Sequence, residues 1–222
     1  MRTIEKNVYN FNELSDDVKN KLIEERKKDA FECYMEFSFH DDMGSKASDL
    51  INDYFGITSD YVYTYYSLSY CQGDGAMIEF DINIVDLNNK YKVFSDEEIR
   101  YINDKGIVND IKVRHHDNLY YHEYTFIIDY DYYNDYDFED IENEYKISKE
   151  EFETIDDRFY NLVDYSNKHY ADSEFVKDII SMNKELSNYG YNIMENYEED
   201  TDFIIEQLCE DEYYENGEVF NV

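Results

Sequence analysis

An excess of negative charge is the feature that most constrains how this chain folds. Its 222 residues include 54 Asp and Glu against 20 Lys and Arg, which gives a formal net charge of −34 at pH 7. Because so much like charge repels itself in a compact state, burial of apolar surface has to offset the repulsion. The same charge excludes nucleic acid and anionic membranes as direct partners and favours a basic protein.

The apolar content is large enough for a core of an unusual kind. Hydrophobic residues make up 42% of the chain and 26 of them are tyrosines, while Trp and Pro are absent. Because Tyr can bury its ring and keep its hydroxyl in water, we expect a core with a broad amphipathic margin. This aromatic and aliphatic content distinguishes the chain from a disordered acidic tail.

The charge is concentrated in the second half. Residues 1–116 contain 23 acidic and 14 basic residues, a net of −9, whereas residues 117–222 contain 31 acidic and 6 basic residues, a net of −25. Near the start of the second half lies the acidic ribbon, residues 129–145, with the sequence DYDYYNDYDFEDIENEY and no Lys, Arg, Pro or Gly. Successive side chains of a strand point to opposite faces, so a strand here would separate carboxylates from rings. The odd-numbered face would carry Asp129, Asp131, Asp135, Asp137 and Glu139, and the even-numbered face Tyr130, Tyr132, Tyr136 and Phe138.

Two interpretations of the acidic ribbon follow from this alternation. Carboxylates two residues apart on a strand lie ~6.5–7 Å apart, given the rise per residue. Phosphates along one DNA strand carry one charge per ~3.4 Å of axial rise, which is a spacing of comparable order. The ribbon would then imitate a nucleic-acid backbone. Alternatively it is a half-buried strand whose exposed face is acidic, because charge runs are commonly solvated faces.

Periodicity predicts helices and then strands in the first half. Residues 15–38 have the apolar spacing of a helix, with Ser15 as its cap, and a second short helix is expected over 45–54. The segments 61–71 and 76–87 have the composition of strands. Between them QGDG, residues 72–75, suits a hairpin because of its two glycines.

Further elements complete the expected fold. SDEEIRYI, residues 95–102, predicts a short helix, and IVNDIKVRHH and YYHEYTFIIDYDYY predict two more strands. From Ser148 onward, apolar stripes predict three helices. The chain contains no Pro-rich or Gly/Ser-rich linker and no internal repeat. We therefore expect a single α+β domain over residues 1–222, with an antiparallel sheet of about four to five strands and segregated N- and C-terminal helices. Residues 129–222 would be its interaction half.

Several motifs together resemble a known family. They are FNELSDDVKNKLIEE near the amino terminus, YSLSYCQGDGAMIEF, HHDNLYYHEYTF, and the carboxy-terminal SMNKELSNYGYNIMENYEEDTDFIIEQLCEDEYYENGEVF. These stretches resemble a family of small phage proteins with an N-terminal FxELSxxxK helix and a CQGDGA hairpin, mostly of unknown activity and loosely labelled antitoxin-like. The resemblance implies a phage origin and transfers no catalytic residue. Phages make acidic proteins that imitate nucleic acid and block restriction or CRISPR nucleases, so it also favours mimicry.

The candidate sites for chemistry are weaker. His115, His116, Asp117 and His122, with Glu123 nearby, have residue types that bind metal, but convergent geometry is required and such clusters are commonly surface histidines. Three widely spaced cysteines form no CxxC pair, which argues against a disulfide framework or a thiolate zinc site. Acidic surroundings would raise the pKa of a Cys71 thiol and oppose its use as a nucleophile. We expect no enzyme activity and no cofactor.

The sequence thus predicts a non-enzymatic phage inhibitor of a host nucleic-acid-binding defence complex, with a CRISPR effector preferred over a restriction nuclease. The acidic ribbon and acidic positions on helices 150–157 and 195–212 would occupy a basic groove that normally holds DNA or RNA. The alternative is an antitoxin-like or general interaction module that neutralises a basic host protein; a metal-dependent enzyme built on the histidines is a third class. The residues predicted to contact the partner are Asp129, Asp131, Asp135, Asp137, Glu139, Asp140, Glu142, Glu144, Asp156, Asp157, Glu198 and Glu199.

The sequence also bears on location. The amino-terminal MRTIEKNVYN lacks the apolar core of a signal peptide, and no apolar run is long enough to cross a bilayer. We therefore expect a soluble protein of the host cytoplasm with no membrane partner.

Overall fold

The structure is a computed structural model that describes residues 7–69, 73–104, 108, 110–116, 120–130, 148–164, 173–197 and 199–220. Over these residues the chain forms seven α-helices, a 3-10 helix and six strands in two antiparallel sheets, so the predicted α+β class is confirmed. The chain divides into two compact units. The first unit comprises Met1–Asp41 and Ile193–Val222, and the second unit comprises Asp42–Asn192. The expected single domain over 1–222 stays a prediction.

A four-stranded antiparallel sheet forms the centre of the second unit. Its strands are β2 (Val62–Ser67), β3 (Gly75–Asn83), β4 (Asp110–His115) and β5 (Phe126–Tyr130), in the order β2-β3-β4-β5. The predicted β2–β3 hairpin is confirmed, and its register pairs Ser67 with Gly75 next to the turn. The alternation of β3 also holds at its carboxyl end, where Phe80 and Ile82 are buried while Asp81 between them is partly exposed.

Several predicted strands were too long, and the strand expected over 61–71 ends at Ser67. The expected strand 76–87 ends at Asn83, whose side chain accepts a hydrogen bond from the Asp86 amide at 2.8 Å and caps α3 (Ile84–Tyr91). An Asn cap offers the backbone a helical start, which the apolar residues that follow then bury. The strand expected to begin near residue 120 begins at Phe126 instead. Before it, Thr125 closes a turn by donating from its backbone amide to the carbonyl of His122 at 3.0 Å.

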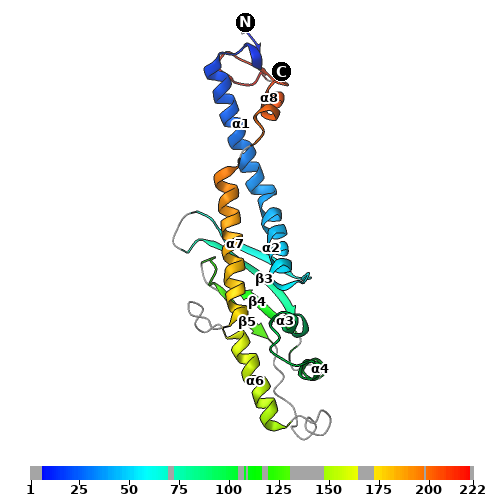
Figure 1. Ribbon diagram of the computed structural model, residues 1–222. Helices are drawn as coiled ribbons and strands as arrows, with labels where there is room; N and C mark the ends of the chain where they lie inside the picture. The colour runs from blue at the N-terminus through cyan, green and yellow to red at the C-terminus, as the bar shows by residue number, and fades with distance from the viewer. Residues whose placement is uncertain are drawn as a thin grey trace, which may run out of the picture. The chain divides into compact units, whose positions relative to one another are not determined.

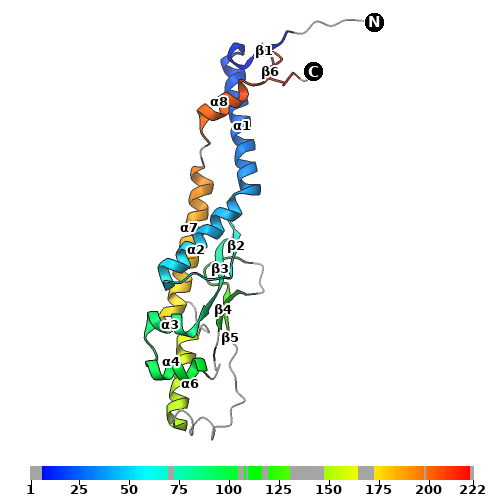
Figure 2. The same cartoon turned by 90° about the vertical axis from the view of Figure 1, so that its right-hand side faces the viewer.

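Helices cover one face of this sheet. Figure 2 shows α2 (Phe39–Phe55) and α7 (Glu174–Asn196) on the same side of the strands. The contact is aromatic, because the ring of Phe55 lies 5.3 Å from that of Phe80 on β3 and 5.8 Å from that of Phe175 on α7. At the other edge of the sheet α6 (Lys149–Val163) packs on β5, where the rings of Tyr130 and Phe159 are 4.9 Å apart. We call this helix-covered side the inner face.

Polar side chains of α7 also bind the sheet directly. β4 pairs with β3 only from Phe80 onward, so the first half of β3 lacks a strand partner on that side. The Asn183 side chain accepts from the Ile78 amide at 2.9 Å, and the Ser187 hydroxyl accepts from the Ala76 amide at 2.7 Å. Because buried backbone amides need an acceptor, these two side chains fix the position of α7 along β3.

The first unit is small. Its strands β1 (Tyr9–Asn10) and β6 (Glu212–Tyr213) pair with each other, and its helices are η1 (Phe11–Glu13), α1 (Asp16–Phe37) and α8 (Thr201–Leu208). Figure 1 labels α1 and α8, and Figure 2 also labels β1 and β6. Ser15 stands at the N-cap of α1, as predicted. Where α1 and α8 meet, the core consists of Phe11, Leu14, Ile204, Leu208 and Tyr213.

The remaining described helix of the second unit is α4 (Asp96–Asp104), which is joined to α6 through the ion pair between Glu98 and Arg158. Throughout the described ranges, no helix has both the length and the apolar character that crossing a membrane requires.

Candidate functional site

The face of the sheet opposite the inner face, here the outer face, brings rings and charges together. By strand alternation it carries Tyr63 of β2, Glu79 and Asp81 of β3, and Lys112 of β4. The register aligns these positions, since Tyr63 lies opposite Glu79 and Asp81 lies opposite Lys112. Lys112 in turn lies opposite Asp129 on β5. Cross-strand neighbours on one face interact, so these residues form one surface.

A buried carboxylate lies under the rings of the outer face. Glu79 is only 5% exposed, and both of its oxygens accept hydrogen bonds. One accepts from the hydroxyl of Tyr61 at 2.9 Å and the other from the backbone amide of His115 at 2.7 Å. A buried charge persists only when it is paired in this way. The bond to Glu79 raises the pKa of the Tyr61 hydroxyl.

Stacked rings extend this surface. The ring of Tyr65 stacks on His115, with centroids 4.7 Å apart, and lies nearly parallel to Tyr121 at 5.9 Å. Tyr63 contacts Tyr65 at 4.9 Å. Tyr61 and Tyr63 are 42% and 46% exposed, so both rings contribute to the surface. Exposed aromatic faces attract cations and stack on guanidinium groups.

Arg114 shows what the outer face does with an arginine. Its guanidinium lies 4.5 Å from the centre of the Tyr61 ring and pairs with the carboxylate of Asp81. It also donates to the backbone carbonyl of Phe80 at 3.1 Å. A ring face, a carboxylate and a carbonyl together meet the stacking and hydrogen-bonding needs of a guanidinium. The chain thus binds one of its own arginines with the groups that a partner's arginine would need.

A second acidic surface lies on α6. The helix begins with a capping box, in which the Ser148 hydroxyl accepts from the Glu151 amide and the Glu151 carboxylate accepts from the Ser148 amide. The bonds that the Ser148 amide and hydroxyl donate to this carboxylate lower the pKa of Glu151. Ile155 and Phe159 are buried toward the sheet. The α6 acidic surface, all of it exposed, consists of Glu150, Glu153, Asp156 and Asp157. Residues three or four apart lie one turn apart, so neighbouring carboxylates follow the axis at steps of ~5 Å.

The predicted partner-binding residues divide into three groups. Asp129, Asp156 and Asp157 are exposed in the second unit. Glu199 is half-buried in the first unit and accepts a hydrogen bond from the Tyr197 hydroxyl at 2.6 Å. The others lie outside the described residues: Asp131, Asp135, Asp137, Glu139, Asp140, Glu142, Glu144 and Glu198.

Only the first two residues of the acidic ribbon belong to the described structure. Asp129 is exposed, whereas Tyr130 is half-buried and packs on Phe159. The predicted separation of carboxylates from rings is therefore confirmed at these two positions, and for the rest of the ribbon it stays a prediction.

The predicted histidine cluster is used for packing and turn formation in the described structure. The His115 ring belongs to the stack on Tyr65, and its Nε2 lies 3.1 Å from the Tyr120 carbonyl. The Nδ1 of His122 accepts from the backbone amide of Tyr124 at 3.2 Å. Asp117 lies outside the described residues. Among those that are described, no three His, Cys, Asp or Glu side chains gather closely enough to hold a metal ion.

Sequence reasoning missed most of the outer face. It did not connect Glu79 and Asp81 with Tyr61, Tyr63 or Arg114. A signal was available in three short stretches, YVYTY (61–65), EFD (79–81) and KVR (112–114). In each stretch every second residue is a ring, an acid or a base, respectively, and residues two apart on a strand share a face.

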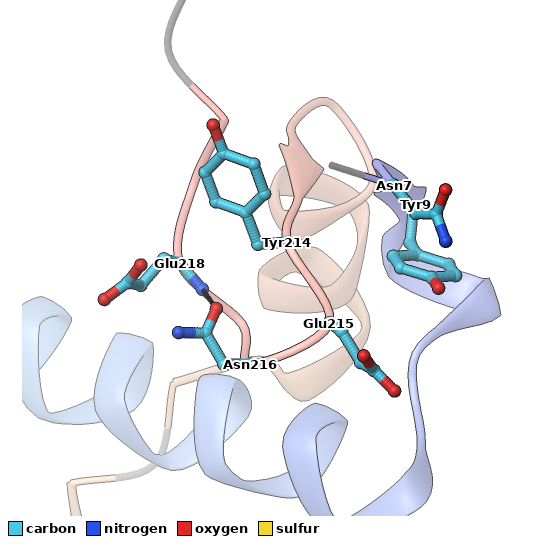
Figure 3. A pocket seen from close by; sticks show the side chains of 6 residues that line it. All are labelled: Asn7, Tyr9, Tyr214, Glu215, Asn216 and Glu218. Carbon is cyan, nitrogen blue, oxygen red and sulfur yellow. Dashed lines mark hydrogen bonds between the residues drawn. The ribbon is translucent and has the colours of Figure 1, made fainter. Parts of the chain in front are cut away.

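The first unit has a pocket with related chemistry. It measures about 370 Å³ beside the β1–β6 pair, and Figure 3 shows its lining. The Asn216 side chain accepts from the Glu218 amide at 3.2 Å and holds the loop that follows β6. The described residues of the lining contribute two rings, two carboxylates and no cation: Asn7, Tyr9, Tyr214, Glu215, Asn216 and Glu218.

No protein-family model, curated protein or solved structure matches this chain. The resemblance to small phage proteins and the functions that it implies therefore stay predictions, and the functional argument depends on the residues themselves.

Proposed function

We propose that this chain is a non-enzymatic interaction module that binds a basic protein, presenting acidic and aromatic groups where that protein would otherwise hold nucleic acid. The observation that carries the proposal is the binding of Arg114 between the Tyr61 ring and the Asp81 carboxylate. The same face keeps Tyr63 and Asp129 exposed, so solvent-accessible groups of the kinds that Arg114 contacts lie on it.

Charge supports a partner that normally binds nucleic acid. Grooves for DNA or RNA are lined by Arg and Lys, which contact phosphates and stack on bases. The four carboxylates of the α6 acidic surface supply negative charge at regular steps, and the tyrosines supply ring faces. The net charge of −34 would also accelerate association with such a groove. The phage resemblance makes a host defence nuclease, and a CRISPR effector before a restriction enzyme, the first class to test.

The experiment is affinity capture from host lysate, identification of the captured protein by mass spectrometry, and competition with that protein's own DNA or RNA. We expect a basic nucleic-acid-binding protein that releases its nucleic acid when this chain binds. A captured partner that holds its nucleic acid and this chain at the same time would contradict mimicry and favour the neutralising module instead.

The acidic ribbon has a test of its own. Replacing Asp131, Asp135, Asp137 and Glu139 by Asn or Gln removes four charges and nearly preserves side-chain shape. We expect binding to the captured partner to weaken by orders of magnitude, because truncating a desolvated interface charge costs ~2–5 kcal/mol. Unchanged binding by this variant would restrict the interface to other surfaces of the chain.

A further inference from the structure

Arg26, on α1 of the first unit, lacks the partner that an arginine normally has. Within the described part of the chain its guanidinium makes no hydrogen bond and no ion pair, and its Nε is buried with no acceptor. The two described arginines of the second unit that contact carboxylates differ in this respect, since Arg114 pairs with Asp81 and Arg158 with Glu98. Among the described residues, an arginine with a buried Nε and no carboxylate partner indicates a group that is available to a ligand.

The guanidinium lines a pocket. A cavity of about 520 Å³ lies between α1 and the segment from Tyr197 to Gln207, which is within the range of small-molecule sites. The terminal nitrogens of Arg26 are not among the buried unpartnered atoms, so they remain accessible. Two parallel N–H donors of a guanidinium match the two oxygens of a carboxylate or sulfonate.

The walls of this pocket are aromatic. Tyr34 of α1 stacks on Tyr197 with ring centroids 4.9 Å apart and planes 25° apart. Phe203 of α8 also lines the pocket and is 50% exposed, so its ring is accessible to a ligand in the pocket. An uncovered ring and an unpaired cation in one cavity point to a ligand with an apolar body and an anionic end.

Carboxylates in the lining limit the charge of that ligand. Asp29 and Glu199 line the same pocket as Arg26, so the described lining holds one cation and two anions. Glu199 is already engaged by the Tyr197 hydroxyl. A ligand with several negative charges, such as a nucleoside triphosphate, would be repelled here, whereas a single charge is offset by Arg26.

We propose that this pocket binds a small organic monoanion, an aryl carboxylate or sulfonate, with its anionic end on Arg26 and its ring against Tyr34, Tyr197 and Phe203. The site uses no group of the outer face or the α6 acidic surface, so it stands independently of the proposed function.

Fluorescence titration provides the first test, with anilinonaphthalene sulfonate as the anionic aryl probe and N-phenylnaphthylamine as its neutral analogue. Arg26→Gln should weaken binding of the sulfonate by about tenfold or more and leave the neutral analogue unchanged, because only the charge-assisted bonds are lost. Arg100→Gln is the matched control, since Arg100 is exposed on α4 of the second unit and the net charge changes equally. Equal weakening by both variants, or no weakening by Arg26→Gln, would overturn the proposal.

Thiol protection provides a second test that needs no variant. Cys33 lines the pocket, whereas Cys209 is exposed outside its lining. Saturating anilinonaphthalene sulfonate should slow iodoacetamide alkylation of Cys33, as followed by peptide mass spectrometry, and leave alkylation of Cys209 unchanged. Unaltered alkylation of Cys33 at saturation would place the probe elsewhere and refute the site.

Discussion

Replacing Asn183 by Leu should destabilise the second unit by removing the acceptor that α7 supplies to β3. The Asn183 side chain is fully buried, and its Oδ1 accepts from the Ile78 amide at 2.9 Å. Its Nδ2 donates to the carbonyl of Glu123 at 3.4 Å and so links α7 to the segment that carries Tyr121. Leu is similar in size, so the main effect is the loss of these bonds rather than a cavity.

The magnitude follows from the group left behind. An unpaired buried backbone amide costs ~1–3 kcal/mol, and the longer bond to Glu123 adds less. We expect the free energy of unfolding to fall by ~1–3 kcal/mol in urea denaturation followed by circular dichroism, with an unchanged m value. Asn188→Leu is the matched control, because Asn188 is exposed on the same helix and surface substitutions usually stay within ~0.5 kcal/mol. Equal unfolding free energies for the two variants would show that Asn183 does not position α7.

Three further outcomes are expected. Gly75→Ala should lower the thermal midpoint by calorimetry, because a Cβ there would lie 3.0 Å from the Tyr121 carbonyl oxygen, and such overpacking costs ~1–3 kcal/mol. Burial by itself raises the pKa of the Glu98 carboxyl. Its bonds to Arg158 and Ser95 lower the pKa by more than burial raises it, so the net shift is downward. The stability that the ionised Glu98 contributes is present above the unfolded pKa of ~4.3 and is lost as pH falls through the folded pKa. The difference in urea midpoint between wild type and Arg158→Gln should therefore shrink in acid, and a difference that stayed constant would refute this. Burial and a bond to a neighbouring carboxylate raise the pKa of Tyr54 to about 12. The stability that the Tyr54 hydroxyl contributes should therefore be lost as pH rises from about 10 to about 12. A difference in thermal midpoint between wild type and Tyr54→Phe that stayed constant over this pH range would contradict the prediction.

Helices were predictable because their signals are local. The predicted helix 15–38 corresponds to α1 at Asp16–Phe37, since a cap residue and apolar spacing define both of its ends. Strand ends were not predictable in the same way. Ile84, Val85 and Leu87, which follow Asn83, fit a strand as well as a helix, and the cap at Asn83 favours the helix α3.

The site was predictable only in part, because it depends on register. Parity places Tyr61 and Tyr63 on one face, but it does not specify that Arg114, from a strand far along the chain, lies over the Tyr61 ring. That placement follows from the register in which β3 pairs with β4, and the sequence alone does not specify this register. That Arg26 has no carboxylate partner among the described residues has no sequence signal, because it depends on which side chains the fold brings near it.

The central claim is that localised acidic charge binds a basic groove, and affinity measured against salt tests it most directly. The captured partner would be titrated with wild type, with Glu150→Gln/Glu153→Gln/Asp156→Asn/Asp157→Asn, and with Asp17→Asn/Glu36→Gln/Asp202→Asn/Glu206→Gln as a control. The control removes the same charge from exposed positions of the first unit. We expect wild-type affinity to fall steeply with salt and the α6 variant to lose about 10- to 1,000-fold with a shallower salt slope, at ~0.4–1 kcal/mol per charge, while the control loses far less. Equal losses in both variants, or affinity independent of salt, would contradict the account.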